Sequence, residues 1–424
     1  MHSLTERAAR APMPSPRRRV GSRQETTMTA LCARSWLGAV LLSSAALADF
    51  GDPLPGLTAE ELAKFEAGKT EFSTAEEPDE GLGPVFNEAA CVTCHTGPGT
   101  AVGGTTQRME TRFGRLRDDG TFDPMPELGG SLLQDQAIGY VSVEAGSYTY
   151  VPEAVPPGQP GELRVVARRR TQPLFGLGLV DATPPSTFIG IAIVQAILSP
   201  SIAGTPSVVP DPSNGGAPAL GKFGWKAQVP SLFVFSGDAY LNEMGVTNPL
   251  FPDENCPQGD CDSLRYNPAL TSPNDDGSGV EKFNDFMTFL AAPPRGGRNF
   301  VTEYGNIVAA AIGCLDCHVQ TLRTGASAVA ALNKVTYHPF SDFLLHDMGA
   351  LGDGITQNQA TGRLMRTQPL WGLRTQANML HDGRATTIIE AIRAHDGQAA
   401  ASRREFESLG FFDRYALRAF LESL

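Results

Sequence analysis

The pentapeptide Cys314-Leu315-Asp316-Cys317-His318 decides how this chain can fold, because it brings two thiols and an imidazole within a few residues. On a helical turn the two thiols share one face, and the imidazole lies beside them. Haem c requires this arrangement: each sulfur adds to a vinyl group of the porphyrin, and the histidine becomes the proximal ligand of the iron. The sequence therefore predicts a covalently attached haem, with His318 on its iron.

The same pattern occurs earlier in the chain as Cys91-Val92-Thr93-Cys94-His95. With 7 Cys and 7 His in 424 residues, one such triplet is expected by chance about 0.002 times. The competing interpretation is a structural zinc site, but zinc ribbons place their paired motifs about 15–20 residues apart. Here Cys314 follows Cys94 by 220 positions. We therefore predict two haem c groups, with His95 and His318 as iron ligands.

An export signal is predicted over Met28 to Ala48. Arg34 supplies its positive region, Trp36–Ala46 its apolar core, and Ala46-Leu47-Ala48 a cleavage site with small residues. The core is too short to span a bilayer. The stretch before Met28 indicates either a mis-assigned start or a long positive region, so residues 1–48 are left out of the fold. We expect a periplasmic protein, secreted by the general export route.

The charge of the chain limits its partners. The net charge is −12, and residues 1–48 carry seven Arg and two Glu, which leaves about −17 on residues 49–424. So acidic a surface argues against nucleic acid and anionic membranes as partners. It suits a basic or weakly docking electron donor, such as a small cytochrome c or a cupredoxin. No stretch outside the signal is long and apolar enough to cross a membrane.

Two further cysteines, Cys256 and Cys261, follow the first haem motif. In an oxidising compartment their spacing predicts a small disulfide loop. Two free thiols are the alternative.

The expected fold is mainly α, with two cytochrome c-like haem domains, long loops and a small β-hairpin insertion. About 376 residues remain after the signal, which is enough for two domains. We expect an N-terminal haem c domain with insertions over residues 49–279 and a C-terminal haem c domain over residues 280–424.

Helices are predicted from caps and from apolar periodicity. Capping boxes begin two of them, at Thr58 with Glu61 and at Thr387 with Glu390, the second ending at Gly397. The other predicted helices are a buried one over Phe188–Leu198, one over Val280–Ala291, and a terminal one with Leu417, Phe420, Leu421 and Leu424 on one face.

Strands and loops are predicted between these helices. Tyr140–Tyr150 alternates like a strand, with Leu163–Arg168 as its expected partner across Pro156–Gly161. Residues 97–135, 199–224 and 248–279 are expected to be loops, the first laid over a cofactor.

An internal repeat supports two related modules. The segment Arg170–Leu177, RTQPLFGL, recurs as Arg366–Leu373, RTQPLWGL. Each copy follows its own haem motif. Duplicated haem modules explain this more simply than coincidence.

Several segments together resemble the family of di-haem oxidoreductases whose members are called peroxidases or "thiol oxidoreductases", relatives of bacterial di-haem cytochrome c peroxidases. The matching segments are Leu82–Asn87, Pro173–Leu179, Phe223–Lys226, Met244–Gly245, Asn248–Pro252, Ser341–Gly349, Pro369–Leu373 and His381–Arg384. The resemblance implies a mostly helical pair of cytochrome c-like domains with the haems near the domain interface. In the better-studied peroxidases one haem binds peroxide and the other delivers electrons. Some of them hold a calcium ion between the domains, but this chain shows no clear calcium loop.

The sixth ligands of the irons are open to several interpretations. No histidine lies between His95 and His318, so the first iron is open or is bound by a methionine or by a residue of the other domain. The usual peroxidase has a displaceable histidine there, and this sequence departs from that pattern. For the second iron we predict Met348 first, then Met365 and Met244, because a thioether raises the reduction potential. Each methionine is otherwise an ordinary core residue.

Other candidate site residues come from the matched segments. His346 and His381 are candidates for contact with propionates or peroxide, or for structural roles, whereas His338 and His395 match nothing specific. Arg366 and Arg384 are candidate propionate partners through paired hydrogen bonds. Trp225 and Trp371 are candidate electron relays or core residues. Peroxide cleavage needs an acid–base group beside the open iron, and Glu127 is the carboxylate that we predict.

The leading functional prediction is an exported di-haem peroxidase that reduces hydrogen peroxide, with a reactive first haem and an electron-transferring second haem. The alternatives are a di-haem oxidase acting on a protein or organic substrate, and an electron-transfer cytochrome without turnover. No residue independently supports thiol chemistry.

Overall fold

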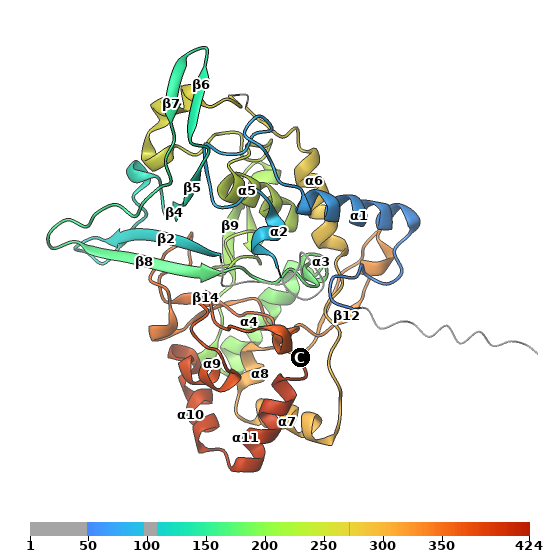
Figure 1. Cartoon of the computed structure of the whole chain (residues 1–424). Helices are drawn as coiled ribbons and strands as arrows, with labels where there is room; N and C mark the ends of the chain where they lie inside the picture. Colours follow the sequence, from blue (N-terminus) through green and yellow to red (C-terminus); the bar gives the residue numbers. More distant parts are fainter. Residues whose placement is uncertain (1–48, 97–107, 271) are drawn as a thin grey trace, which may run out of the picture. The chain divides into compact units, whose positions relative to one another are not determined.

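Helices, short strands and long connections alternate along residues 49–96, 108–270 and 272–424, which are the residues that the computed structural model describes (Figure 1). The predicted export signal and the Arg-rich stretch before it lie outside the described residues. All described residues fall in one compact unit of the chain. Their helices are α1 (Ala59–Ser73), α2 (Cys91–Cys94), α3 (Leu177–Asp181), α4 (Pro185–Leu198), α5 (Leu232–Met244), α6 (Ser278–Phe289), α7 (Phe300–Ala311), α8 (Cys314–Cys317), α9 (Ile388–Ala394), α10 (Ala400–Ser408) and α11 (Phe411–Leu421).

The strands are short and pair mostly as hairpins. They are β1 (Val85–Phe86), β2 (Met109–Leu116), β3 (Phe122–Asp123), β4 (Leu132–Leu133), β5 (Gln136–Ala137), β6 (Tyr140–Val143), β7 (Gly146–Thr149), β8 (Leu163–Arg170), β9 (Ser207–Asp211), β10 (Ala217–Gly221), β11 (Leu322–Arg323), β12 (Thr336–Tyr337), β13 (Leu345–Asp347) and β14 (Leu364–Arg366). A mainly helical chain with β-hairpins is thus what the structure contains.

Two pairs of helices pack closely, α1 with α6 and α7 with α11. In each pair, one helix precedes a C-x-x-C-H motif: α1 precedes α2, and α7 precedes α8. Helix α1 begins at the predicted capping box of Thr58 and packs against α6. At Gly68 an added Cβ would lie 2.2 Å from the carbonyl oxygen of Lys282, so only glycine permits this approach. By its contacts α6 packs with the N-terminal half, although the predicted boundary after residue 279 assigned most of it to the C-terminal domain.

Helix α7 crosses α11 in the same manner before the second motif. An added Cβ at Gly305 would lie 2.0 Å from the carbonyl oxygen of Ala416. Leu417 and Phe420 of α11 are buried in this contact, as the predicted amphipathic pattern requires. The division into two haem domains itself stays a prediction.

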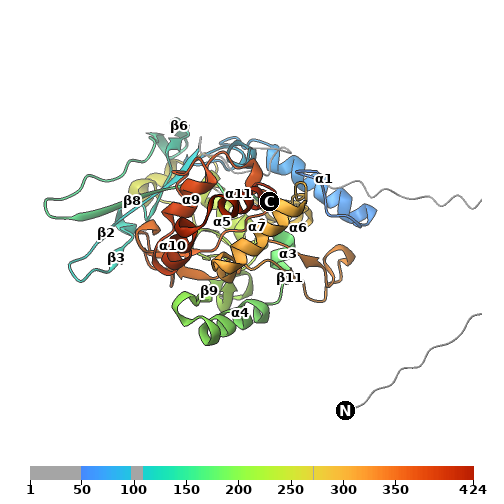
Figure 2. The same ribbon diagram turned by 90° about the horizontal axis from the view of Figure 1, so that it is seen from below.

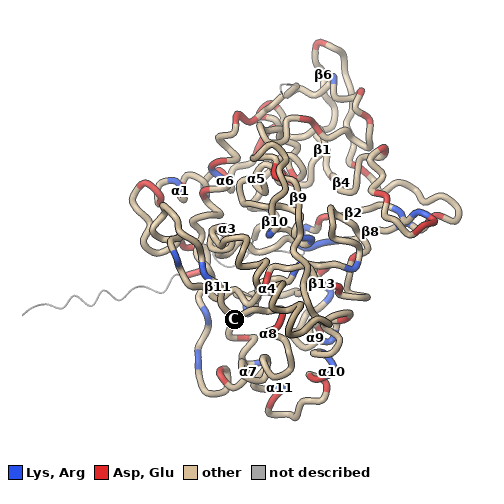
Figure 3. The backbone as a smooth tube through the Cα atoms, turned by 180° about the vertical axis from the view of Figure 1, so that it is seen from behind, with Lys and Arg blue, Asp and Glu red and all other residues tan. Residues whose placement is uncertain are grey.

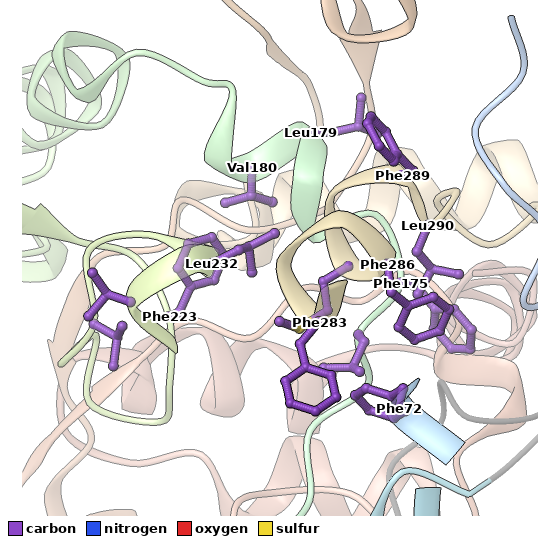
Figure 4. Packing of buried hydrophobic residues seen from close by; sticks show 14 of the residues in the cluster. Phe72, Phe175, Leu179, Val180, Phe223, Leu232, Phe283, Phe286, Phe289 and Leu290 are labelled. Carbon is purple, nitrogen blue, oxygen red and sulfur yellow. The ribbon is translucent and has the colours of Figure 1, made fainter. Parts of the chain in front are cut away.

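The main hydrophobic core lies around α6 (Figure 4). Phe286 is fully buried and packs on Phe65 of α1 and on Phe72, with ring centroids 5.4 and 5.0 Å apart. Burying one such ring contributes about 1.5–3 kcal/mol. Phe72 also contacts the ring of His95, at 5.6 Å, so this core supports the first motif directly.

The sheet pairing differs from the sequence prediction. β6 and β7 form a hairpin within the predicted strand over 140–150, whereas β8 pairs along its whole length with β2 (Figure 1). The expected partnership across Pro156–Gly161 is therefore wrong. Of the expected loop over 97–135, residues 97–107 lie outside the described residues, and residues 108–135 contain β2, β3 and β4. The alternation of β2 was missed because the strand is rich in charged residues: Lys and Arg positions gather along β2 and β8 (Figure 3).

Three other predictions need correction. Residues 199–224 contain the β9–β10 hairpin, in which Ser207 faces Gly221. The apolar run 188–198 is helical, but α4 lies at an edge of the molecule (Figure 2) and exposes Ile197 and Leu198 at 72% and 75%. The helix that begins at Thr387 ends at His395, because Gly397 already opens a separate 3-10 turn.

A buried ionic cluster joins β8 to the segment before β14. Asp353 accepts from Arg169 and lies 2.9 Å from Nζ of Lys226, and all three side chains are buried. The Lys226 ammonium also donates to the carbonyl oxygens of Thr361 and Leu364, at 3.0 and 2.7 Å. Two cations thus share one carboxylate, and burial lowers the pKa of Lys226 to about 8.

The predicted disulfide between Cys256 and Cys261 is confirmed. Within the described ranges, no helix has both the length and the apolarity needed to cross a bilayer.

Candidate functional site

The first motif forms one helical turn, α2, and His95 caps its end. The backbone N–H of His95 donates to the Cys91 carbonyl at 3.0 Å, which holds both thiols and the imidazole on one turn. Burial lowers the pKa of His95 to about 4, and the backbone of Gln172 opposes this shift. His95 is therefore neutral at pH 7, which is the state that can ligate a metal.

The second motif repeats this geometry in α8. The His318 N–H donates to the Cys314 carbonyl at 3.0 Å, and Nδ1 of His318 lies 2.9 Å from the carbonyl oxygen of Phe340. Such a bond fixes the tautomer and ring orientation of a ligating histidine, with the proton on Nδ1 and the lone pair on Nε2. Burial lowers the pKa of His318 to about 4 as well.

The four motif cysteines are free thiols, whereas the other described pair forms the disulfide. Burial raises the pKa of Cys91, Cys94 and Cys314 to about 12. A zinc site needs thiolates, and no described group of ligands gathers the two cysteine pairs. Neutral thiols on one helical turn, beside a neutral imidazole, fit attachment of haem c at both motifs.

A cavity with about 2,020 Å³ of empty space, including its open mouth, adjoins the first motif. Cys91, Cys94 and His95 form part of its wall. Both copies of the internal repeat line it too, through Arg170–Leu174 and through Arg366, Gln368 and the residues that follow. The repeat therefore marks segments that converge on one space from distant parts of the sequence.

The arginines of the two repeats are buried without an acidic partner. Arg170 donates to the Leu380 carbonyl and to Gln376, and Arg366 donates to the Gly224 carbonyl and to Gln368. Neither forms an ion pair with a described residue. Burial lowers the pKa of Arg170 to about 10 and that of Arg366 to about 9. A buried cation without a counter-ion is costly, so the cavity favours an anionic ligand.

The glutamines of the two repeats give the same indication. The side-chain nitrogens of Gln172 and Gln368 are buried, and neither makes a hydrogen bond with the described residues. Buried donors are nearly always satisfied in native proteins. Two equivalent unsatisfied donors on one cavity fit a bound group with acceptor atoms, such as the propionates of a haem.

Acidic residues line another part of the cavity. We use the name carboxylate cluster for Glu110 of β2 with Asp238 and Glu243 of α5. Glu110 is ion-paired with Arg112. Although burial opposes it, Arg112 and Arg169 hold the pKa of Glu110 below its usual range.

The other two members of the carboxylate cluster hold their protons more tightly. Burial, reinforced by Glu110, raises the pKa of Asp238 to about 6 and that of Glu243 to about 7. Glu243 accepts from the side-chain amide of Asn87 at 2.7 Å, and Asp238 accepts from Asn242 at 3.0 Å. Carboxylic acids that release a proton near pH 7 are suited to general acid–base chemistry.

The sequence reasoning missed the carboxylate cluster, and the structure does not place Glu127 in the cavity. Glu127 has a side chain that is 54% exposed and lies 3.4 Å from Arg115. The missed signal was the pair of acidic residues on the otherwise apolar helix α5.

The remaining predicted residues fall in three places. Met244, the third methionine that we predicted for the second iron, lies at the first motif instead: it is buried, and its sulfur lies 3.9 Å from Sγ of Cys91. His381 is buried against Trp225, with ring centroids 6.3 Å apart, but does not line the cavity. Arg384 is exposed and pairs with Asp382. Trp225 and Trp371 both line the cavity.

His346 lies at the second motif. Its Nδ1 is 3.6 Å from Sγ of Cys317, and its Nε2 is 2.9 Å from Asp342. Although burial opposes it, the bond to Asp342 raises the pKa of His346 to about 10. Cys317, Asp342 and His346 are close enough to hold a cation. However, the thiol belongs to the haem motif, and the other two form an ion pair.

The other two methionines that we predicted for the second iron lie along the β13–β14 hairpin. Met365 is buried in β14 and faces His346 across the pairing, whereas Met348 follows β13 and donates its N–H to the Arg363 carbonyl. His395, to which we assigned no role from the sequence, lies close to His318.

Comparison with known proteins agrees with this geometry. A family model described as "Di-haem oxidoreductase, putative peroxidase" matches residues 162–424. No curated protein matches the sequence. Among solved structures, hydrazine synthase of Kuenenia stuttgartiensis is similar with a TM-score of 0.35 and 12% identity, over 95% of this chain and 100% of that chain. A likeness that weak carries no argument here.

Proposed function

The chain belongs to the di-haem oxidoreductase family, and from this premise we propose that it is an exported c-type peroxidase. In the proposed reaction one hydrogen peroxide takes up two electrons and two protons and yields two waters. One haem would be attached to Cys91 and Cys94 with His95 on its iron, and the other to Cys314 and Cys317 with His318. When bound, these groups supply an iron that can accept peroxide and a place to store electrons.

The observation that carries the proposal is the carboxylate cluster in the cavity of the first motif. Peroxide cleavage requires a proton to move between the two oxygens and further protons to reach the products. Glu243 and Asp238, with pKa values of about 7 and 6, can hold and release such protons near neutral pH. The described surroundings of the second motif offer the His346–Asp342 ion pair instead, in which the imidazole holds its proton up to about pH 10.

The repeat residues would hold the haem propionates. Arg170 and Arg366 supply positive charge without an acidic partner, and Gln172 and Gln368 supply free N–H donors. A bound dianion would neutralise the buried guanidinium groups and satisfy the amides. The two chain segments would then be fixed against each other by the bound group.

Electrons would enter through the second motif. Trp371 lies in the second repeat and lines the cavity, while the neighbouring Leu370 and Leu373 pack on the hydrophobic cluster that also contacts Cys314. This segment therefore connects the surroundings of both motifs. The acidic chain suits a donor with a basic docking face, such as a small cytochrome c or a cupredoxin.

The test is peroxide reduction by the exported, haem-loaded protein, with a reduced small cytochrome c and a reduced cupredoxin as donors. We expect two donor molecules oxidised per peroxide. Peroxide-dependent oxidation of an added organic or protein substrate, with the donor untouched, would replace the proposal by a di-haem oxidase. If neither peroxide nor the added substrate is consumed, the proposal is replaced by an electron-transfer cytochrome.

A further inference from the structure

The rings of His318 and His395 lie close together, although they come from distant parts of the sequence. Their centroids are 6.5 Å apart and their planes are inclined by 57°. His318 caps α8, and His395 caps α9, which lies more than seventy positions later in the sequence. The two rings are not stacked, because the planes of stacked rings would be nearly parallel.

Both rings are held with the same nitrogen available. Nδ1 of His318 lies 2.9 Å from the Phe340 carbonyl, and Nδ1 of His395 lies 2.7 Å from the Ala391 carbonyl. A carbonyl oxygen accepts only, so both Nδ1 atoms carry the proton and both Nε2 atoms carry a lone pair. Neither Nε2 has a hydrogen-bond partner among the residues that the structure describes. Metal-ligating histidines are typically held in this way.

The separation matches two imidazoles on one metal ion. A metal–imidazole bond is about 2 Å long, and a ring nitrogen lies about 1 Å from the ring centroid, so two rings on opposite sides of one ion have centroids roughly 6 Å apart. The 6.5 Å between the centroids of His318 and His395 leaves room for one ion between two imidazoles.

The backbone around His395 holds it in place. Arg403 donates to the carbonyl oxygen of His395 at 2.8 Å, and Ile389 and Ile392 of α9 pack on the same hydrophobic cluster as Cys314. An apolar wall next to the motif suits a bound porphyrin.

The other candidates fit this position less well. Both nitrogens of His346 are engaged, by Cys317 and by Asp342. His338 is exposed and bonds Thr321 at 3.0 Å. Met365 faces His346 across the β13–β14 pairing, and Met348 follows β13.

We infer that His395 is the sixth ligand of the haem attached at Cys314 and Cys317, which makes this haem bis-histidine. Such an iron is six-coordinate and cannot take up peroxide without losing a ligand, so this haem transfers electrons. Its potential lies below that of a histidine–methionine haem, because a methionine ligand raises the potential. The inference rests on the two haems of the proposed function but not on peroxide chemistry at the first.

The test compares His395→Ala, His395→Met and His338→Ala in exported protein whose mass shows two attached haems. We expect His395→Ala to convert one haem from low spin to high spin. His395→Met should restore the low-spin state with a higher reduction potential and with the far-red charge-transfer band of methionine-ligated ferric haem. His338→Ala removes an exposed imidazole of the same domain and should leave the spectra unchanged.

A His395→Ala protein that keeps both haems and an unchanged low-spin spectrum would overturn the inference. If that variant fails to fold, the wild-type protein decides by near-infrared magnetic circular dichroism: bis-histidine bands support the inference, and a methionine–iron band overturns it. A bis-histidine spectrum without peroxide turnover would refute only the proposed function, and turnover with a methionine–iron band would refute only the inference.

Discussion

Replacing Glu243 by glutamine tests the proposed acid–base chemistry most sharply. Burial raises the pKa of Glu243 from 4.5 to about 7. At pH 7 about half of these side chains are protonated, against roughly 0.3% for a glutamate with pKa 4.5. Glutamine keeps the size and the acceptor oxygen for Asn87 but cannot release a proton.

General acid–base catalysis contributes about 10²–10⁴-fold to a rate. Asp238, with a pKa of about 6, lies in the same carboxylate cluster and can substitute in part. We therefore expect Glu243→Gln to lower the rate of peroxide reduction about 100-fold and to remove the decline in rate above pH 7. Stopped-flow mixing of peroxide with haem-loaded protein between pH 5 and 9, a range of about two units on each side of the pKa, measures both effects.

The same substitution, which lowers the rate of peroxide reduction, should raise the free energy of unfolding above pH 7. Because the folded pKa is raised, the folded state holds a proton that the unfolded chain has already lost between pH 4.5 and about 7. The free energy of unfolding therefore falls as the pH rises through this window, by about 3 kcal/mol in all. Glutamine removes this loss, so the variant should be more stable than the wild type above pH 7.

Glu254→Gln is the matched control. Burial raises the pKa of Glu254 to about 8, but this residue does not line the cavity. The control should gain stability at high pH and keep its peroxide rate. A Glu243→Gln protein with full activity and an unchanged pH profile, or an equal loss of activity in Glu254→Gln, would refute the reasoning.

Three further predictions follow from the buried charges and the disulfide. Arg366→Leu should lower the reduction potential of one haem, because a buried positive charge is lost beside it. Arg384→Leu, at an exposed pair, should leave the potential unchanged. Potentiometric titration measures both, and equal shifts would contradict the placement of Arg366 beside a haem. Lys226→Met should lower the free energy of unfolding by about 3 kcal/mol, since it breaks a buried pair. Lys282→Met, at a partly exposed pair, should cost less than about 1 kcal/mol in denaturant titration; similar losses would show that the ionic cluster contributes no more than a surface pair. Replacing Cys256 and Cys261 by serine should lower the free energy of unfolding by about 2 kcal/mol, as expected for a short disulfide loop. Mass spectrometry should still show both haems attached; loss of a haem would link the disulfide to the motifs.

Local rules were sufficient for much of the helical structure. The capping boxes at Thr58 and Thr387 lie where the sequence placed them, because a hydroxyl and a glutamate three residues apart satisfy each other within one turn. The disulfide of Cys256 with Cys261 was equally local. By contrast, the pairing of β8 with β2 joins segments about fifty residues apart, and the short β6–β7 hairpin between them had the stronger alternation.

Some residues of the candidate site could also be predicted from local sequence patterns, and others could not. The two C-x-x-C-H turns are local patterns and could be recognised, as could the repeat that supplies Arg170 and Arg366. The carboxylate cluster could not, because Glu110 and Glu243 come from a strand and a helix that meet only in the folded chain. His395 was passed over for the same reason: only the folded chain brings it close to His318.

The most direct test of the account is the electron paramagnetic resonance spectrum of the fully oxidised protein, recorded on material whose mass shows two attached haems. An open iron at His95 and a bis-histidine iron at His318 predict one high-spin and one low-spin signal in equal amounts. Two low-spin signals would contradict an open first iron and leave an electron-transfer cytochrome in place of a peroxidase.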